Sequence, residues 1–157
     1  MLEAYQLAAD AFTSTADERA TEPDSFWVNR IANPTGMTEA YGAFDGAELV
    51  GTVALEFSAK PKTRHKALII GMYVTAAARG RKTARALLDA AIESAGSRQG
   101  IALLTLTATE GNEPAISLYR SAGFEVFGVE PMAILTPSGY KAKVYMWFQV
   151  SHVLTAA

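Results

Sequence analysis

The chain has 157 residues, of which 50% are hydrophobic and 19% are charged. That balance is ordinary for a folded globular protein and argues against disorder, and we expect a single domain over residues 1–157. The formal net charge of −2 argues against a molecule that binds nucleic acid over its whole surface.

Cysteine is absent, which excludes a disulfide framework, a thiolate zinc site and a cysteine nucleophile. The two histidines, His65 and His152, are well separated along the chain, so we expect no metal site. No apolar run approaches the length of a membrane span, and the first residues lack the pattern of a signal peptide. We therefore expect a soluble cytoplasmic protein that does not engage a membrane.

The first part of the chain predicts two helices. Apolar residues at helical spacing indicate a helix over residues 2–12, and the polar stretch 13–21 is interpreted as a loop. Pro23 and Asp24 then open a second helix, because proline is tolerated in a first helical turn. Turn-forming residues at 33–36 end this helix.

A hairpin and a basic loop come next. Residues 39–44 and 49–57 are rich in strand-forming types and flank Asp45 and Gly46, a dipeptide typical of hairpin turns. The loop 58–65 contains most of the basic residues of this region.

The second half alternates strands with helices. We expect the strands at 67–74, 101–107, 125–129 and 143–150, and the helices at 79–95 and 113–122. Gly96 is expected to stop the first of these helices. This order predicts an α/β (α+β) fold with a mixed, mostly antiparallel sheet. The strands 67–74 and 101–107 should form a parallel pair joined by a helical crossover.

Four cations crowd the start of the helix that follows strand 67–74: Arg79, Arg81, Lys82 and Arg85. The N-terminus of a helix already carries about half a positive charge, so cations there cost roughly 0.3–1 kcal/mol each. An anion bound to the free N–H groups would explain them, and a small phosphorylated ligand suits so local a cluster. The alternative is a solvated charge run whose long stems cover apolar surface.

Three stretches together resemble one family. Met72–Val74 followed by Arg79–Ala84 is similar to a pyrophosphate loop of the form Gln/Arg-x-x-Gly-x-Gly/Ala. Asn112–Phe124 is similar to Asn-x-x-Ala-x-x-x-Tyr-x-x-x-Gly-Phe, and Phe127–Ala133 is a common continuation. In this order and spacing they resemble the GNAT superfamily of acetyl-CoA-dependent N-acetyltransferases. Lys82 is a departure, since it stands where the family normally has its first glycine.

The resemblance implies the family fold, with helices on both sheet faces and the parallel pair splayed at the cofactor site. It also implies direct attack of an amine on acetyl-CoA, with a backbone N–H near Val74 as oxyanion donor and Tyr119 as the acid that protonates the leaving sulfur. The implied cofactor-binding residues are Met72, Tyr73, Val74, Arg79, Gly80, Arg81, Lys82, Thr83, Ala84, Arg85, Asn112 and Tyr119.

Two of these residues have a simpler interpretation. Tyr119 could be a core tyrosine on an amphipathic helix, and Asn112 could be only a helix N-cap. The general base is left open among Glu56, His65 and Glu110.

The sequence contains little that identifies the acceptor. As in the family, the N-terminal helices and the loop 58–65 should wall its site, and aromatic residues could line it: Phe26, Trp27 and Tyr41. The acceptor is therefore left as a small amine or a peptide or protein amine.

A second hypothesis from a different class stays open. Lys82 and the lack of an evident base would also suit a GNAT-like module that holds CoA or acyl-CoA without turnover. The family further suggests a homodimer, through the C-terminal strand and its aromatic residues, which are Tyr145, Trp147 and Phe148.

Overall fold

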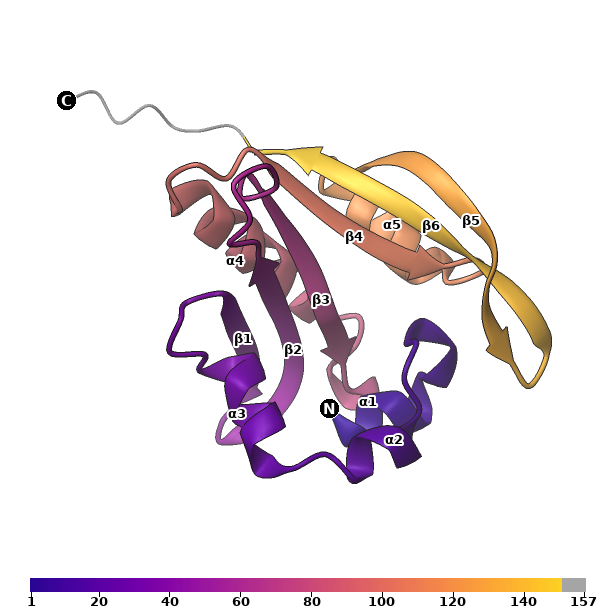
Figure 1. The fold of residues 1–157 in the computed structure, drawn as a ribbon. Helices are drawn as coiled ribbons and strands as arrows, with labels where there is room; N and C mark the ends of the chain where they lie inside the picture. Colours follow the sequence, from indigo (N-terminus) through magenta and orange to yellow (C-terminus); the bar gives the residue numbers. More distant parts are fainter. Residues whose placement is uncertain (151–157) are drawn as a thin grey trace.

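The computed structural model of this protein describes residues 1–150, which form one six-stranded sheet with helices on both faces (Figure 1). The helical elements are α1 (Leu2–Leu7), η1 (Ala9–Ala11), α2 (Ala16–Ala20), α3 (Asp24–Ile31), η2 (Ala76–Ala78), α4 (Thr83–Ser97) and α5 (Glu113–Ser121). The strands are β1 (Thr38–Asp45), β2 (Glu48–Phe57), β3 (Lys66–Val74), β4 (Leu103–Thr109), β5 (Glu125–Thr136) and β6 (Gly139–Gln149). The mixed α/β fold class is confirmed.

The sheet has the strand order β1-β2-β3-β4-β6-β5. Every neighbouring pair is antiparallel except β3 and β4, which run parallel and are joined through α4. The hairpin turn predicted at Asp45 and Gly46 is confirmed, because Asp45 pairs with Glu48 across it. The parallel pair predicted from the alternation of strands and helices is confirmed as well.

The parallel pair is joined over only part of its length. Its register covers Lys66 to Leu68 on β3, which lie opposite Leu103 to Thr105 on β4. Beyond these residues the two strands diverge, and Figure 1 shows the sheet opening into two halves toward the C-terminal end of β3. The splayed parallel pair that the family resemblance implied is therefore present.

A bulge in β3 lies just where the strands part. Thr52 pairs with Tyr73 and Ala54 pairs with Ile70, so two residues of β3 lie opposite one residue of β2. Gly71 is one of the two, and its φ of 63° lies in the left-handed region that favours glycine. Because a bulge bends its strand and increases the local twist, Gly71 helps to turn β3 away from β4.

The region 13–21, predicted as a loop, contains α2, so that prediction was wrong. The helix begins with a capping box: the N–H of Glu18 donates to Thr15 Oγ1 at 3.2 Å, and the N–H of Thr15 donates to Glu18 Oε2 at 2.7 Å. These bonds satisfy backbone donors that a helix start otherwise leaves unpaired. The spacing Thr-x-x-Glu was visible in the sequence and was the signal for this helix.

The last hairpin is longer than predicted. The structure continues β5 through Pro131 to Thr136 and starts β6 already at Gly139, where a loop was expected. Proline is tolerated because the register shifts between Glu130 and Ile134, so the missing N–H falls in a bulge and removes no ladder bond. β6 lies inside the sheet between β4 and β5, so the C-terminal strand is not an edge.

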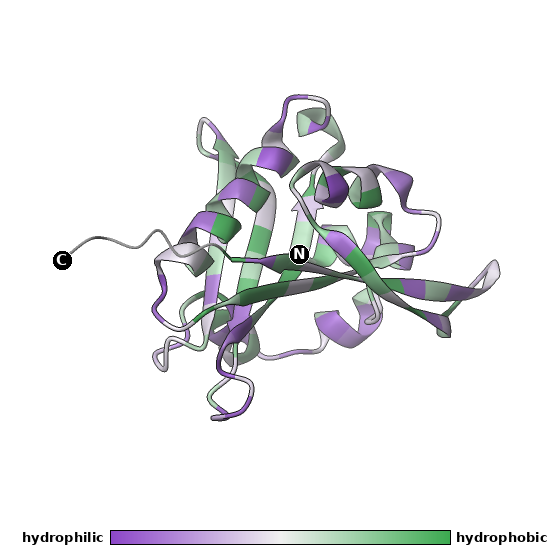
Figure 2. Ribbon diagram, turned by 90° about the horizontal axis from the view of Figure 1, so that it is seen from above, coloured by the Kyte–Doolittle hydropathy of each residue, from purple (hydrophilic) through white to green (hydrophobic). Residues whose placement is uncertain are grey.

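The core lies between α4 and the first three strands and continues under α5. Leu87, Leu88, Ala91 and Ala95 are the buried face of α4, which runs past Gly96 instead of stopping there. Figure 2 shows the resulting stripes, with hydrophobic and hydrophilic residues on opposite sides of the helices. Among residues 1–150, no helix is long and apolar enough to cross a membrane.

Candidate functional site

A cavity of about 580 Å³ fills the opening between the diverging strands. One wall is the second half of β3, from Ile69 to Val74, and the facing wall is the end of β4, from Thr107 to Thr109. α5 and the N-terminal helices close the remaining sides. The cavity therefore exists because the parallel pairing stops early.

The β3 wall presents a strand edge that has no strand partner in the described residues. β4 pairs with β3 only as far as Leu68, so the stretch from Ile69 to Val74 is paired on its β2 side alone. The carbonyl of Val74 accepts a hydrogen bond from Arg79 Nε at 3.1 Å. An extended ligand with amide groups can pair with such an edge as an added strand does.

Tyr119 lines the far side of this cavity from α5. Its residue is only 6% exposed and its ring lies 6.1 Å from that of Phe124, centroid to centroid. Burial raises the pKa of Tyr119 to about 12, so the phenol keeps its proton at neutral pH. The tyrosine is thus both a core residue and a proton-bearing group at the cavity wall.

Asn112 is both a helix cap and a residue of the cavity wall. Its Oδ1 accepts a hydrogen bond from the N–H of Ala115 at 3.4 Å, so it is the N-cap of α5. Asn112 also lines the cavity. The same is true of four more predicted cofactor-contacting residues: Met72, Tyr73, Val74 and Arg79.

The start of α4 lies directly after Lys82, beside the end of β3. Lys82 is the N-cap of α4 and has φ 63° and ψ 9°, and no side chain caps this helix start. The first N–H groups of a helix have no partner within the helix, so those of α4 are open to an anion. The backbone at Lys82 is left-handed, a conformation that glycine adopts more readily than lysine.

Two of the four cations predicted to crowd the start of α4 are paired with carboxylates of this chain. Arg81 forms an ion pair with Asp45 at 2.9 Å, and Arg85 forms one with Asp89 at 2.8 Å. Of the loop and helix start, the cavity is lined by Arg79 and Ala84, whereas the other predicted residues lie outside its lining: Gly80, Arg81, Lys82, Thr83 and Arg85. Arg81 and Arg85 therefore fit the alternative interpretation of these cations, a solvated charge run, in this structure.

None of the three candidate bases lines the cavity. Glu56 is half-buried on β2, His65 is exposed before β3, and Glu110 is exposed and accepts a hydrogen bond from the N–H of Ala142 at 3.4 Å. Within the described residues, no group of three His, Cys, Asp or Glu side chains could hold a metal. His152 lies outside the described residues.

The N-terminal segment forms a wall of the cavity, as expected, but the loop 58–65 does not. Two hydrogen bonds fix this segment to the sheet: Thr109 Oγ1 donates to the Asp10 carbonyl at 2.6 Å, and Lys141 Nζ forms an ion pair with Asp10 at 2.6 Å. Both come from residues that the sequence analysis did not single out. No local pattern marks them, because their partners are far apart in the chain.

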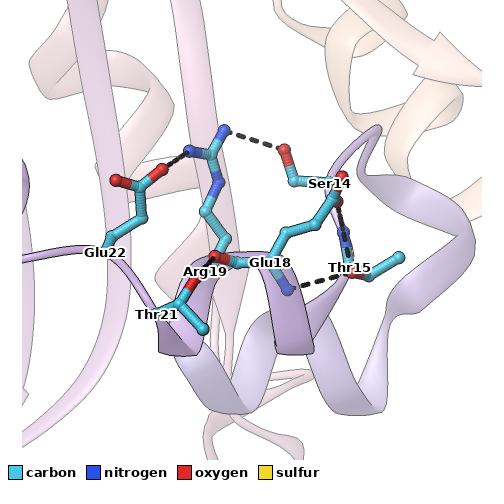
Figure 3. A network of polar contacts seen from close by, with 6 residues as sticks. All are labelled: Ser14, Thr15, Glu18, Arg19, Thr21 and Glu22. Atoms are coloured by element: carbon cyan, nitrogen blue, oxygen red, sulfur yellow. Dashed lines mark hydrogen bonds and ion pairs between the residues drawn. The ribbon is translucent and has the colours of Figure 1, made fainter.

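Two arginines of the N-terminal helices also line the cavity, and the sequence analysis missed both. Arg19 donates to Ser14 Oγ at 2.7 Å and pairs with Glu22 at 3.2 Å, in the network drawn in Figure 3. Its guanidinium carbon lies 4.7 Å from the ring centroid of Phe26, and that of Arg30 lies 5.3 Å from the same ring. The aromatic residues predicted for the acceptor wall (Phe26, Trp27 and Tyr41) do not line the cavity themselves.

The site therefore consists of a mixed sheet that opens at its parallel pair and an uncapped helix start beside the opening. The family model described as Acetyltransferase (GNAT) family matches residues 1–124, and the chain belongs to this family.

Individual relatives agree with this assignment. The L-amino acid N-acetyltransferase AaaT of Escherichia coli K12 is 28% identical over 123 residues, which is 78% of this chain and 75% of the relative. A GCN5-related N-acetyltransferase from Kribbella flavida superposes with a TM-score of 0.78 at 27% identity, over 94% of this chain and 86% of the other. A ribosomal-protein-alanine N-acetyltransferase from Brucella melitensis has a TM-score of 0.76 at 24% identity, over 94% and 91% of the two chains. The protein is therefore an N-acetyltransferase.

Proposed function

We propose that residues 1–157 form one domain that transfers the acetyl group of acetyl-CoA to a primary amine of a small molecule, a peptide or a protein. The observation that carries this proposal is the cavity at the splayed strands, where the unpaired edge of β3 faces Tyr119. The edge fits the amide-containing arm of CoA, and the uncapped start of α4 fits its pyrophosphate. We expect the reaction to take place in the cytoplasm.

The chain's own groups suit a direct transfer. Acetyl-CoA would supply the acetyl thioester. The neutral acceptor amine forms a C–N bond to the acetyl carbon and leaves a negative charge on the carbonyl oxygen, and the C–S bond breaks when this oxyanion collapses. The amine's proton passes to water. This transfer needs no side-chain base, in agreement with a cavity lining that contains none of the three candidate bases. Tyr119 gives its phenol proton to the departing sulfur and takes one back from water. A backbone N–H near Val74 would stabilise the oxyanion.

The alternative is a module that binds CoA without turnover, and one pair of experiments separates the two. We expect acetyl-CoA to bind the wild type in calorimetric titration and to bind Lys82→Glu at least about tenfold more weakly, since the variant places a negative charge at the helix start. Lys62→Glu is the control, because Lys62 lies in the loop 58–65, outside the cavity lining. Equal binding by Lys82→Glu and the control would overturn the pyrophosphate site.

Turnover is tested by release of free CoA thiol with a panel of amines. Loss of a positioned proton donor typically slows a reaction by about two to four orders of magnitude, so we expect Tyr119→Phe to lower kcat by at least about a hundredfold. Phenylalanine keeps the ring that packs on Phe124. A folded wild type that binds acetyl-CoA but acetylates no amine would leave the non-catalytic module as the function.

We also propose a homodimer, but through β5 instead of the C-terminal strand. β5 is the edge strand beside β6 and exposes a row of apolar side chains, namely Val126, Phe127, Val129, Met132 and Leu135. A second copy pairing with such an edge would cover them. Light scattering that gives the mass of one chain, 16.8 kDa, would contradict this proposal.

A further inference from the structure

The charge of the cavity is one-sided. Four cationic side chains line it: Arg19, Arg30, Arg79 and Lys143. Among the described residues that line it, none is an aspartate, a glutamate or a histidine. Such a lining attracts anions and disfavours a polycationic acceptor such as a polyamine.

The phosphates of the proposed donor account for only part of this charge. Arg79 follows β3 and lies on the side of α4, where the proposed function places the pyrophosphate. Arg19 and Arg30 come instead from α2 and α3, the N-terminal helices that wall the cavity. Of these two, Arg19 is paired with Glu22, so the charge of Arg30 is the one that a second anion would balance.

The two arginines contact the same aromatic ring. Both guanidinium groups lie over Phe26, at 4.7 Å for Arg19 and 5.3 Å for Arg30. Arg19 is neutralised by Glu22 and fixed by Ser14, as Figure 3 shows, and its buried Nε has no partner in the described residues. Arg30 has no hydrogen-bond or ion-pair partner among residues 1–150, so the pair carries an excess positive charge.

The simplest explanation of Arg30 is a cation placed at a helix C-terminus, where it stabilises the helix. That role requires no position in a cavity and no neighbouring arginine. Arg120 at the last turn of α5 fills the same role, yet it is exposed and does not line the cavity. Arg30 is therefore placed for a ligand as well.

We propose that the acceptor is a free α-amino acid, an amine that carries its own carboxylate, and that Arg30 binds this carboxylate. The guanidinium is a planar donor whose geometry matches a carboxylate, and such charge-assisted hydrogen bonds are strong where water is limited. This inference rests on the proposed function and adds the chemical class of the acceptor. It makes Arg30 a residue that determines specificity, because a peptide N-terminus lacks a carboxylate next to its amine.

The test compares each free amino acid with its own carboxamide, which keeps the amine and removes the negative charge. L-leucine, L-methionine and L-phenylalanine and their amides serve as acceptors, with thiol release as the readout. We expect kcat/KM of the wild type to favour the acids at least about tenfold. In Arg30→Gln this preference should fall about tenfold or more, mainly through the KM of the acid, and Arg30→Lys should be intermediate.

Arg120→Gln is the matched control, since it removes an arginine from the last turn of another helix, and its preference should equal that of the wild type. Circular dichroism and CoA titration show whether each variant keeps its fold and donor site. A wild type that acetylates amides or peptides as fast as free acids overturns this inference and leaves the proposed function intact. If Arg30→Gln and Arg120→Gln keep the same preference for acids, the proposed role of Arg30 is overturned. If no amine is acetylated, both the function and the inference fail.

Discussion

Lys82 departs from the motif that the start of α4 resembles. It stands at the position of a family glycine and adopts a left-handed conformation, with φ 63°, at the N-cap of α4. A residue with a Cβ pays roughly 1–2 kcal/mol for that conformation, whereas glycine adopts it freely. Position 82 therefore has a backbone conformation that glycine favours, although it carries a lysine.

A pair of substitutions isolates this strain. We expect Lys82→Gly to be more stable than Lys82→Ala by about 1 kcal/mol, because both remove the charged side chain and only alanine keeps the Cβ. For a chain of this size that difference corresponds to about 2–4 °C in Tm. Thermal unfolding followed by circular dichroism measures it, and equal midpoints for the two variants would contradict the left-handed conformation.

Other residues at the site serve two purposes at once. Tyr119 packs in the core and faces the cavity, and Asn112 caps α5 while lining the same cavity. The sequence offered the structural and the functional interpretation of each as alternatives. The structure places each residue where both hold, because the helix that carries them forms one wall of the opening.

At the scale of elements, the opening depends on how β3 bends. Gly71 lies in the bulge opposite β2, and Thr52 Oγ1 donates to its carbonyl at 2.9 Å, which satisfies a group that the bulge removes from the ladder. The β3 edge beyond it is then free to face the cavity. A single left-handed glycine thus links the register of the sheet to the shape of the site.

We expect Gly71→Ala to lower the free energy of unfolding by roughly 1–2 kcal/mol, because alanine is strained at a φ of 63°. The same change should weaken acetyl-CoA binding if the bulge straightens to relieve the strain. Gly128→Ala on β5 is the control: its φ is not positive and an added Cβ meets nothing within 4 Å, so it should not destabilise. Urea unfolding and calorimetric titration provide the two readouts, and similar values for both variants would refute the role of Gly71.

The elements that the sequence predicted best were those with strong local signals. The hairpin at Asp45 and Gly46 and the α5 start at Asn112 follow from turn and cap chemistry that acts within a few residues. The capping box of α2 had an equally local signal, Thr15 with Glu18, which was overlooked. The length of β5 could not be predicted, because Pro131 is tolerated only through a bulge in its pairing with β6.

At the scale of the whole molecule, the buried phenol of Tyr119 couples stability to pH. In the folded protein its pKa is raised by burial to about 12, whereas the unfolded chain ionises near the ordinary value of 10.0. Below pH 10.0 the protonated phenol makes its full contribution to the stability of the folded protein. As the pH rises toward 12, only the unfolded state loses the proton, so the unfolded state becomes more favourable. The free energy of unfolding should then fall by up to roughly 3 kcal/mol.

Tyr119→Phe has no proton to lose, so the difference in stability between wild type and variant should change over this range and stay constant below it. Urea unfolding of both proteins between about pH 8 and about pH 11 measures that difference. Other tyrosines ionise in both proteins and cancel in the comparison. A difference that does not change with pH would mean that Tyr119 is solvated, contrary to its 6% exposure.

The sequence by itself determined the family, the order of the strands, and the motif positions on β3, α4 and α5, because each depends on residues close together in the chain. Only the tertiary structure decided where the parallel pairing ends, which cations face the cavity, and that Arg19 and Arg30 share the ring of Phe26. The reason is physical: these features arise from contacts between distant segments, and a strand or helix pattern does not specify its partners.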